Sequence, residues 1–166
     1  DGSAWTSRTS GTTSAIYGIT YGDGTFVAVG EGGIILTSSD GSTWTPRTSG
    51  QNSTLTNVTY ANGKFVTVGN LGIILNSPNG TTWTPSTSGT TNAFSGITYG
   101  DSTFVAVGEG GIILTSSDGS AWTPRTSGTT NFLIGITHAN GTFVTVGSSG
   151  TLLTSYDGSN WTSRTS

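Results

Sequence analysis

Few residues in this chain have side chains that support acid–base, nucleophilic or metal chemistry. Among its 166 residues there is one histidine, His138, and there is no cysteine. The sequence therefore offers no thiolate ligand, no disulfide and no cysteine nucleophile. A lone histidine would leave a zinc site dependent on carboxylates, an arrangement that zinc sites rarely use. We interpret His138 as a substituted tyrosine beside a turn, and we expect no catalytic residue.

Carboxylates are the other candidate ligands, and their oxygens suit calcium. Asp23, Glu31 and Asp40 each have an identical counterpart 78 residues later. Asp23 and Glu31 bracket one predicted strand, so at ~3.3 Å per residue they lie roughly 20 Å apart. The sequence therefore predicts no metal site and no cofactor.

Charged residues are sparse and form no cluster that would attract a polyanion. Eight acidic and five basic residues give a formal net charge of −3, and only 8% of all residues are charged. This composition excludes nucleic acid and anionic membrane surfaces as expected partners. No apolar run approaches the roughly 20 residues of a membrane span, so we expect no membrane insertion.

Five tryptophans at a constant interval of 39 residues reveal tandem repeats. Aligned on tryptophan, the chain reads as one repeat array with blades at residues 6–44, 45–83, 84–122 and 123–161. Residues 1–5 begin an extra outer strand, and residues 162–166 end the last one. The first and third repeats match at 32 of 39 positions, whereas the first and second match at 21. The array therefore derives from duplication of a pair of repeats.

Each repeat contains four short segments with the period-two apolar alternation of β-strands. In the first repeat they are residues 16–21, 26–29, 34–36 and the segment around Trp44. Turn residues separate them at Asp23-Gly24, at Glu31-Gly32-Gly33 and at Asp40-Gly41, and Asx-Gly pairs accept the positive φ angles of tight hairpins. Pro46 follows Trp44, and proline belongs on an edge strand. The pattern predicts an antiparallel four-stranded meander with the fourth strand outermost.

A repeated four-stranded meander occurs in β-propellers, and the β-solenoid is the alternative. Three hairpin turns per repeat favour the propeller, because solenoid strands pair with neighbouring coils instead. We therefore predict an all-β propeller of four-stranded blades, with four repeats and one redundant fourth strand. Phe26 and Val29 are expected to pack blade on blade, and each tryptophan is expected to fill the gap between adjacent blades near the rim.

The stretch Ser38-Ser39-Asp40-Gly41-Ser42-Thr43-Trp44 resembles the Asp-box of the bacterial-neuraminidase-repeat propellers. In that family Ser, Asp, Gly and Trp stabilise the turn between the third and fourth strands. This sequence has one residue fewer between Asp and Trp than the common motif. The structural motif residues are Asp40, Gly41, Trp44, Asn79, Gly80, Trp83, Asp118, Gly119, Trp122, Asp157, Gly158 and Trp161.

Sialidases of this family need an arginine triad that converges on a carboxylate. Here four arginines occupy one equivalent strand position, with Ser86 at the fifth, so a ring spreads them around its rim. We therefore expect a non-sialidase, non-enzymatic member of the family. The four are Arg8, Arg47, Arg125 and Arg164.

The repeats differ most in the second turn and in the connection between blades, and a meander places both on one face. Loops on a rigid scaffold often carry binding residues, although drift in unconstrained loops gives the same pattern. We predict a binding module on this face for a glycan or a protein ligand, because aromatic side chains suit both. The candidate residues are Tyr17, Glu31, Leu71, Phe94, Glu109, Phe132 and Ile134.

Residues 1–10 repeat residues 157–166 at every position except Ala4, which aligns with Asn160. The chain therefore has one fourth strand too many. We expect self-association, either as a dimer that forms an eight-bladed ring or as a fibre. A structural subunit of such a ring or of an extracellular filament is the alternative to the binding module. Low charge and abundant Thr and Gly favour a bacterial surface or secreted protein.

Overall fold

The computed structural model describes residues 2–165 and contains four antiparallel sheets, or blades, of four strands each. Blade 1 consists of β1 (Ile16–Gly22), β2 (Thr25–Gly30), β3 (Ile35–Ser38) and β4 (Thr45–Arg47). Blade 2 consists of β5 (Leu55–Ala61), β6 (Lys64–Gly69), β7 (Ile74–Ser77) and β8 (Thr84–Ser86). Blade 3 consists of β9 (Phe94–Gly100), β10 (Thr103–Gly108), β11 (Ile113–Ser116) and β12 (Thr123–Arg125). Blade 4 consists of β13 (Leu133–Ala139), β14 (Thr142–Gly147), β15 (Leu152–Ser155) and β16 (Thr162–Ser163).

Strand order within every sheet follows the sequence, which confirms the predicted meander. The first strand of each blade lies beside the first strand of the next, and the short fourth strand is outermost. Pro46 lies in β4, which pairs only with β3, as expected for a residue that cannot donate a ladder hydrogen bond. The sheets are offset from the tryptophan-to-tryptophan repeat, because each fourth strand begins just after a tryptophan.

Turn chemistry sets the hairpins. Asp23 and Gly24 have φ angles of 46° and 71°, so both central residues of the first turn adopt the left-handed conformation. The second turn of each blade is a short 3-10 segment: η1 (Glu31–Gly33), η2 (Asn70–Gly72), η3 (Glu109–Gly111) and η4 (Ser148–Gly150). The Asx-Gly pairs therefore act as the sequence predicted.

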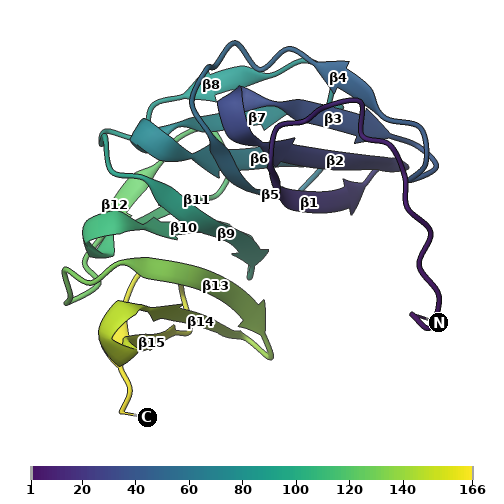
Figure 1. Cartoon of the computed structure of the whole chain (residues 1–166). Coiled ribbons are helices and arrows are strands. Elements are labelled where there is room, and N and C mark those ends of the chain that lie inside the picture. Colours follow the sequence, from purple (N-terminus) through teal and green to yellow (C-terminus); the bar gives the residue numbers. More distant parts are fainter. Residues whose placement is uncertain (1, 166) are drawn as a thin grey trace.

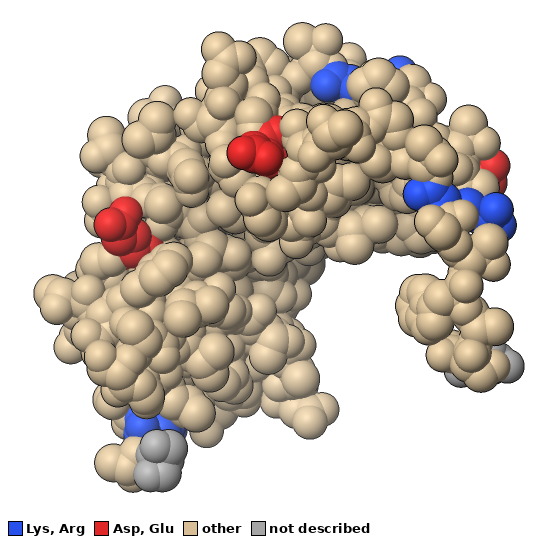
Figure 2. Space-filling model, in the orientation of Figure 1, with Lys and Arg blue, Asp and Glu red and all other residues tan. Residues whose placement is uncertain are grey.

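The four blades form an arc that stays open between blade 4 and blade 1 (Figure 1). The architecture is that of a β-propeller whose ring is incomplete within one chain. Figure 2 shows that the charged side chains on this side of the arc are few and scattered.

Apolar packing between consecutive blades forms the core. We call the side of a blade that faces the preceding blade its front face, and the opposite side its back face. Val27, Val29 and Ile35 on the back face of blade 1 pack against Leu55 and Val58 on the front face of blade 2. Two equivalent clusters join blades 2 and 3 and blades 3 and 4. The blade-on-blade packing of Val29 is thus confirmed, whereas Phe26 instead contacts aromatic rings of its own blade, because no blade of the chain precedes its face.

Tryptophans fill the outer part of these contacts, as predicted. Trp83, Trp122 and Trp161 each pack against the cluster formed with the preceding blade. Trp5 lies in the segment before β1, where residues 2–15 form no strand, and its side chain is 91% exposed. The redundant fourth strand is therefore unpaired, and residues 162–163 complete blade 4.

The front face of blade 1 has no preceding blade within the chain, so its phenylalanine is only half-buried. We expect Phe104→Ala to lower the free energy of unfolding by about 3–5 kcal/mol, because Phe104 is fully buried between blades 2 and 3. Phe26→Ala, the matched change at the equivalent position, should cost less than about 2 kcal/mol. Urea denaturation of the dilute protein measures both values, and equal losses would contradict this account of the core.

Candidate functional site

The second turns and the inter-blade connections lie together on one side of the arc, as predicted. Within blade 1, the Glu31 amide donates to the Ala15 carbonyl at 2.9 Å, and a Cβ added to Gly33 would lie 2.2 Å from the Gln51 carbonyl oxygen. The same contacts recur in blades 2 and 3. We call this surface, formed by η1–η4 and residues 48–54, 87–93 and 126–132, the variable face.

Six of the seven predicted binding residues are exposed: the apolar or aromatic Tyr17, Leu71, Phe132 and Ile134, and the two glutamates Glu31 and Glu109. Tyr17 and Ile134 occupy the bulge near the start of the innermost strands β1 and β13. They belong to the two end blades, so the structure does not bring them together with Leu71 in blade 2. The seven predicted residues therefore do not form one continuous site.

The two glutamates serve the scaffold. Glu31 accepts a hydrogen bond from the Ala15 amide through Oε2 at 3.4 Å, and Glu109 accepts one from the Ala93 amide at the same distance. In blade 4 the Ser148 hydroxyl accepts from the Phe132 amide at 3.0 Å. This position in the second turn holds the connection that precedes the first strand.

Phe94 is a core residue, which corrects its assignment to the exposed surface. Its side chain is 1% exposed and packs in the cluster between blades 2 and 3. Its equivalents Leu55 and Leu133 are buried in the same way. Phe94 begins β9 immediately after the variable connection, so reading that whole stretch as a loop concealed its inward position.

Leu71 is the unusual residue of the variable face. Its φ and ψ angles are 57° and 30°, in the left-handed region, and its side chain is 67% exposed. The equivalent positions hold Gly32, Gly110 and Ser149. A bulky residue with positive φ is a genuine outlier, because its Cβ crowds the backbone. An apolar side chain is thus held toward solvent at a conformational cost.

Three equivalent shallow depressions follow the variable face, one at each of blades 1 to 3. Each lies between the second turn, the fourth strand and the connection that follows it. Arg47 and Arg125 line the depressions of blades 1 and 3, whereas Ser86 replaces arginine in blade 2. The blade 2 depression is therefore uncharged, and Leu71, Gln51 and Pro85 contribute to it. Gln51 and Pro85 are not among the predicted binding residues, because their place beside Leu71 depends on tertiary structure.

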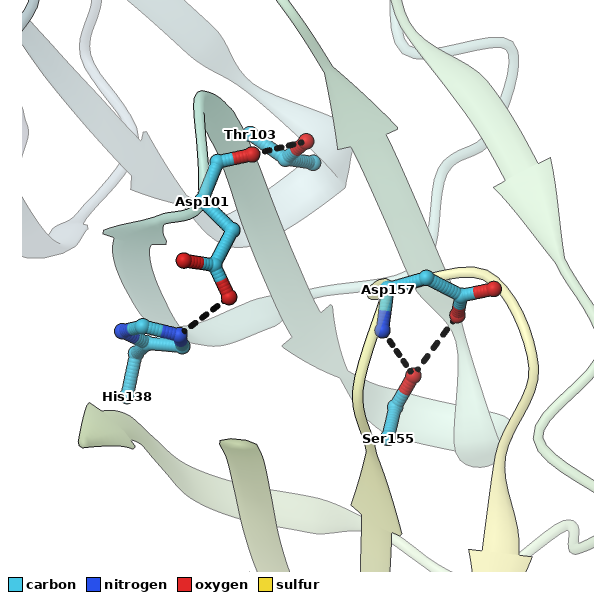
Figure 3. Close-up of polar contacts among 5 residues, drawn as sticks. All are labelled: Asp101, Thr103, His138, Ser155 and Asp157. Atoms are coloured by element: carbon cyan, nitrogen blue, oxygen red, sulfur yellow. Dashed lines mark hydrogen bonds and ion pairs between the residues drawn. The ribbon is translucent and has the colours of Figure 1, made fainter. Parts of the chain in front are cut away.

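The third turn of each blade, between its third and fourth strands, is held by side-chain-to-backbone hydrogen bonds. In blade 1, Asp40 Oδ1 accepts from the amides of Ser42 and Thr43, both at 2.8 Å, and the Ser38 hydroxyl accepts from the Gly41 amide at 2.9 Å. Figure 3 shows the equivalent Ser155 and Asp157 in blade 4. Asn79 makes the same contacts in blade 2 through its amide oxygen, at 2.9 and 3.1 Å.

These bonds stabilise the charged form of each aspartate. The backbone amides of Thr43 and then Ser42, with the Ser38 hydroxyl, lower the pKa of Asp40 to about 2. The amides of Ala121 and Ser120 lower the pKa of Asp118. Bonds from Asn160 and Ser159 lower the pKa of Asp157 in the same way.

The tryptophan after the third turn bonds to that turn in some blades and not in others. The indole N–H groups of Trp83 and Trp161 donate to the carbonyls of Gly80 and Gly158, at 3.0 and 2.9 Å. The indole nitrogen of Trp122 is buried and has no partner among the described residues. The equivalent carbonyl, that of Gly119, instead accepts from the Ser86 hydroxyl at 3.5 Å.

His138 lies on β13 and contacts the preceding blade. Its Nε2 atom is 2.9 Å from Oδ2 of Asp101, as Figure 3 shows, and its ring packs on Phe143 with a centroid distance of 4.4 Å. The side chain is mostly buried, because it packs over the backbone of Gly100. His138 thus joins blades 3 and 4 at the position where tyrosine does so elsewhere.

The arginines of the outer strands bond within their own blades. The Nε atoms of Arg47, Arg125 and Arg164 donate to threonine hydroxyls of the adjacent third strand at 2.8–2.9 Å. In blade 2 the pair is Asn76 and Ser86, at 2.9 Å. Among residues 2–165 no three His, Asp or Glu side chains gather as metal ligands. No helix in that range is long and apolar enough to cross a membrane.

Solved structures share this architecture at low sequence identity. YCF48 from Cyanidioschyzon merolae superposes with a TM-score of 0.74 at 20% identity, over 93% of this chain and 58% of that chain. A structure of YCF48 bound to a D1 peptide gives 0.71 and 20%, over 97% and 56%. The computationally designed Ika4 protein gives 0.72 and 15%, over 87% and 92%. The chain thus spans a little over half of YCF48, and the likeness establishes the propeller fold. No family model and no curated protein sequence matches the chain.

The lowered pKa values of the turn aspartates predict acid sensitivity. A carboxylate whose pKa falls on folding stabilises the protein above its unfolded pKa and loses that effect as the pH falls through its folded value. For Asp40 this window runs from near 4 down to about 2. The triple variant D40N/D118N/D157N should keep the fold, because Asn79 already makes these bonds, and should lose less stability in acid.

Thermal unfolding at pH 7, 4 and 2 measures this difference. N79D is the matched control, since it adds a fourth titrating turn and should increase the acid sensitivity. An unchanged pH profile in both variants would show that these turns do not govern acid stability.

Proposed function

We propose that the chain is a non-enzymatic binding module that recognises an uncharged, partly apolar protein segment at the blade 2 depression of the variable face. The observation that carries this proposal is Leu71. Leucine in the left-handed region costs about 1–2 kcal/mol, and glycine at the same position avoids the steric part of that cost. Strained residues that persist at exposed sites are concentrated where a surface performs a function.

The surroundings of Leu71 suit such a ligand. Gln51 and Thr90 offer hydrogen-bonding groups, while Pro85 and Ile73 add apolar surface to the same depression. The replacement of arginine by Ser86 removes the positive charge present in the equivalent depressions. A short peptide segment could place an apolar side chain against Leu71 and bond to the polar rim, as in other mostly apolar binding sites.

The structural neighbours support a protein ligand at the level of the fold. A YCF48 structure is described as bound to a D1 peptide, so a protein of this architecture does bind a peptide. Its identity to this chain is 20%, and the peptide contacts are not transferred to residues of this chain.

A non-catalytic role agrees with the placement of the reactive side chains. His138 is engaged with Asp101 and Phe143, and the outer-strand arginines are each committed to a threonine of their own blade. We further propose a bacterial cell-surface or secreted location, for which the support is the low charge and the Thr- and Gly-rich composition.

Replacing Leu71 separates stability from binding. L71G should raise the free energy of unfolding by about 0.5–1 kcal/mol, since relief of the left-handed strain exceeds the entropy that glycine loses. It should also remove binding of peptides selected against the immobilised protein from a displayed random library. S149G makes the same type of change in blade 4 and should leave peptide binding intact. Selected peptides that bind L71G as well as the original protein would overturn the proposed site.

Glycan binding is the second candidate, and it rests on the exposed aromatic side chain of Tyr17. An exposed ring can stack on a sugar, with the hydroxyl group as a polar contact. A glycan array should then show a signal that Y17A abolishes. Silence across the array at high protein concentration would remove the lectin-like role.

A further inference from the structure

The three blade contacts within the chain follow one pattern. Each joins the back face of one blade to the front face of the next through branched apolar side chains that are mostly buried, with Ile136 of blade 4 half-buried. On the back face, Val29, Val68 and Val107 are all 0% exposed. On the front face, Val58 and Ile97 are 4% and 6% exposed. A neighbouring blade therefore reduces the exposure of the side chains at these positions.

Two faces of the same kind remain uncovered, one at each end of the arc. Ile19, the front-face equivalent of Val58, is 60% exposed, and Val146, the back-face equivalent of Val29, is 47% exposed. The two faces contain no charged residue at the contact positions. Those positions are Ile16, Ile19, Tyr21 and Phe26 in blade 1, and Val144, Val146 and Leu152 in blade 4.

A glycine on the front face of blade 1 leaves space that a valine of the preceding blade fills in the other blades. A Cβ added to Gly80 would lie 3.0 Å from Cγ2 of Val27 in the preceding blade, and one on Gly158 would lie 3.1 Å from Val105. The equivalent Gly41 of blade 1 meets only Phe26 of its own blade, at 3.7 Å. Gly41 therefore lacks the valine of a preceding blade, and Val144 of blade 4 is the equivalent valine.

The variable face shows the same incomplete contact. Gly111 lies under the Ser127–Thr129 turn, so that an added Cβ would be 2.0 Å from the Thr129 carbonyl oxygen, whereas Gly150 has no neighbour within 4 Å. Residues 10–12 form the equivalent turn before blade 1, with the Ser10 hydroxyl donating to the Thr12 carbonyl at 3.2 Å. In the other blades the equivalent turn covers a glycine of the preceding blade, but no glycine among residues 2–165 lies beneath residues 10–12.

Odd and even blades differ in sequence, and this difference indicates that the free face of blade 4 matches the free face of blade 1. Where an even blade precedes an odd one, Tyr99 and Ala61 both pack on the cluster between blades 2 and 3, and Asn62 follows Ala61. The front face of blade 1 carries the equivalent Tyr21, and blade 4 ends its first strand with Ala139 followed by Asn140. A contact between the back face of blade 4 and the front face of blade 1 would therefore bring together the same residue types as the contact between blades 2 and 3.

We infer that the back face of blade 4 binds the front face of blade 1 of a second copy, and that two identical contacts close an eight-bladed ring. Each copy has one face of each kind, so two copies related by a two-fold axis leave no face uncovered. Figure 1 places the two end blades on either side of the opening of the arc, where a second arc would meet them.

Charge complementation tests this contact directly. I19E and V146K each place an unpaired charge at the new interface, and each should weaken self-association at least roughly 30-fold, as loss of an interface hot spot does. Both side chains are exposed in the single chain, so both variants should keep their secondary structure by circular dichroism. T84E adds the same charge on the exposed outer strand of blade 2 and should not change association.

Sedimentation velocity over a range of concentrations gives the masses. The original protein and T84E should sediment as dimers and each single variant as a monomer. An equimolar mixture of I19E and V146K should regain the dimer, through one unaltered contact and one Glu–Lys contact. A monomeric original protein, a mass that keeps rising with concentration, or a mixture that stays monomeric would overturn the two-copy ring. This test is independent of the proposed peptide site, because Leu71 takes no part in it.

Discussion

The structure depends on apolar contact between the back face of one blade and the front face of the next. Each blade has four short strands and encloses little core of its own, so most of its large apolar side chains become buried against a neighbouring blade. This dependence explains how a chain with 31% hydrophobic residues folds: the apolar residues are concentrated on the two faces that meet. It also explains why equivalent residues are buried in the middle of the arc and exposed at its ends.

The abundant polar residues keep those faces in register. Serine, threonine and aspartate side chains bond to nearby backbone amides in the third turn and in the connections, which are positions where such local bonds replace regular structure. Every blade retains the bonds from backbone amides to the side-chain oxygen of the turn Asp or Asn, as when asparagine replaces aspartate at position 79. The constant spacing of 39 residues is therefore maintained by turn chemistry, and the blade contact is repeated at each step.

Sequence reasoning identified the repeat, the strands, the left-handed turns, the proline edge and the place of the tryptophans, because each depends on local patterns. It placed Phe94 on the surface, although Leu55 and Leu133 at the equivalent position gave a signal that the position is apolar in every blade. The contact of His138 with Asp101 and the uncharged depression beside Leu71 join residues of different segments, so local patterns could not reveal them. The positive φ of Leu71 was accessible in part, since glycine stands at the same position in blades 1 and 3.

The central claim is that a blade face of this type is completed by a second blade face, inside the chain or from another copy. Because the chain lacks cysteine, a disulfide can form only between introduced residues. The variant I19C/V146C places one thiol on each end face, and V29C/V58C marks the internal contact as a positive control. After mild oxidation, a non-reducing gel should show the first variant as a covalent dimer and the second as a monomer with an internal bridge. A first variant that stays a monomer, or forms a ladder of larger species, would contradict the account.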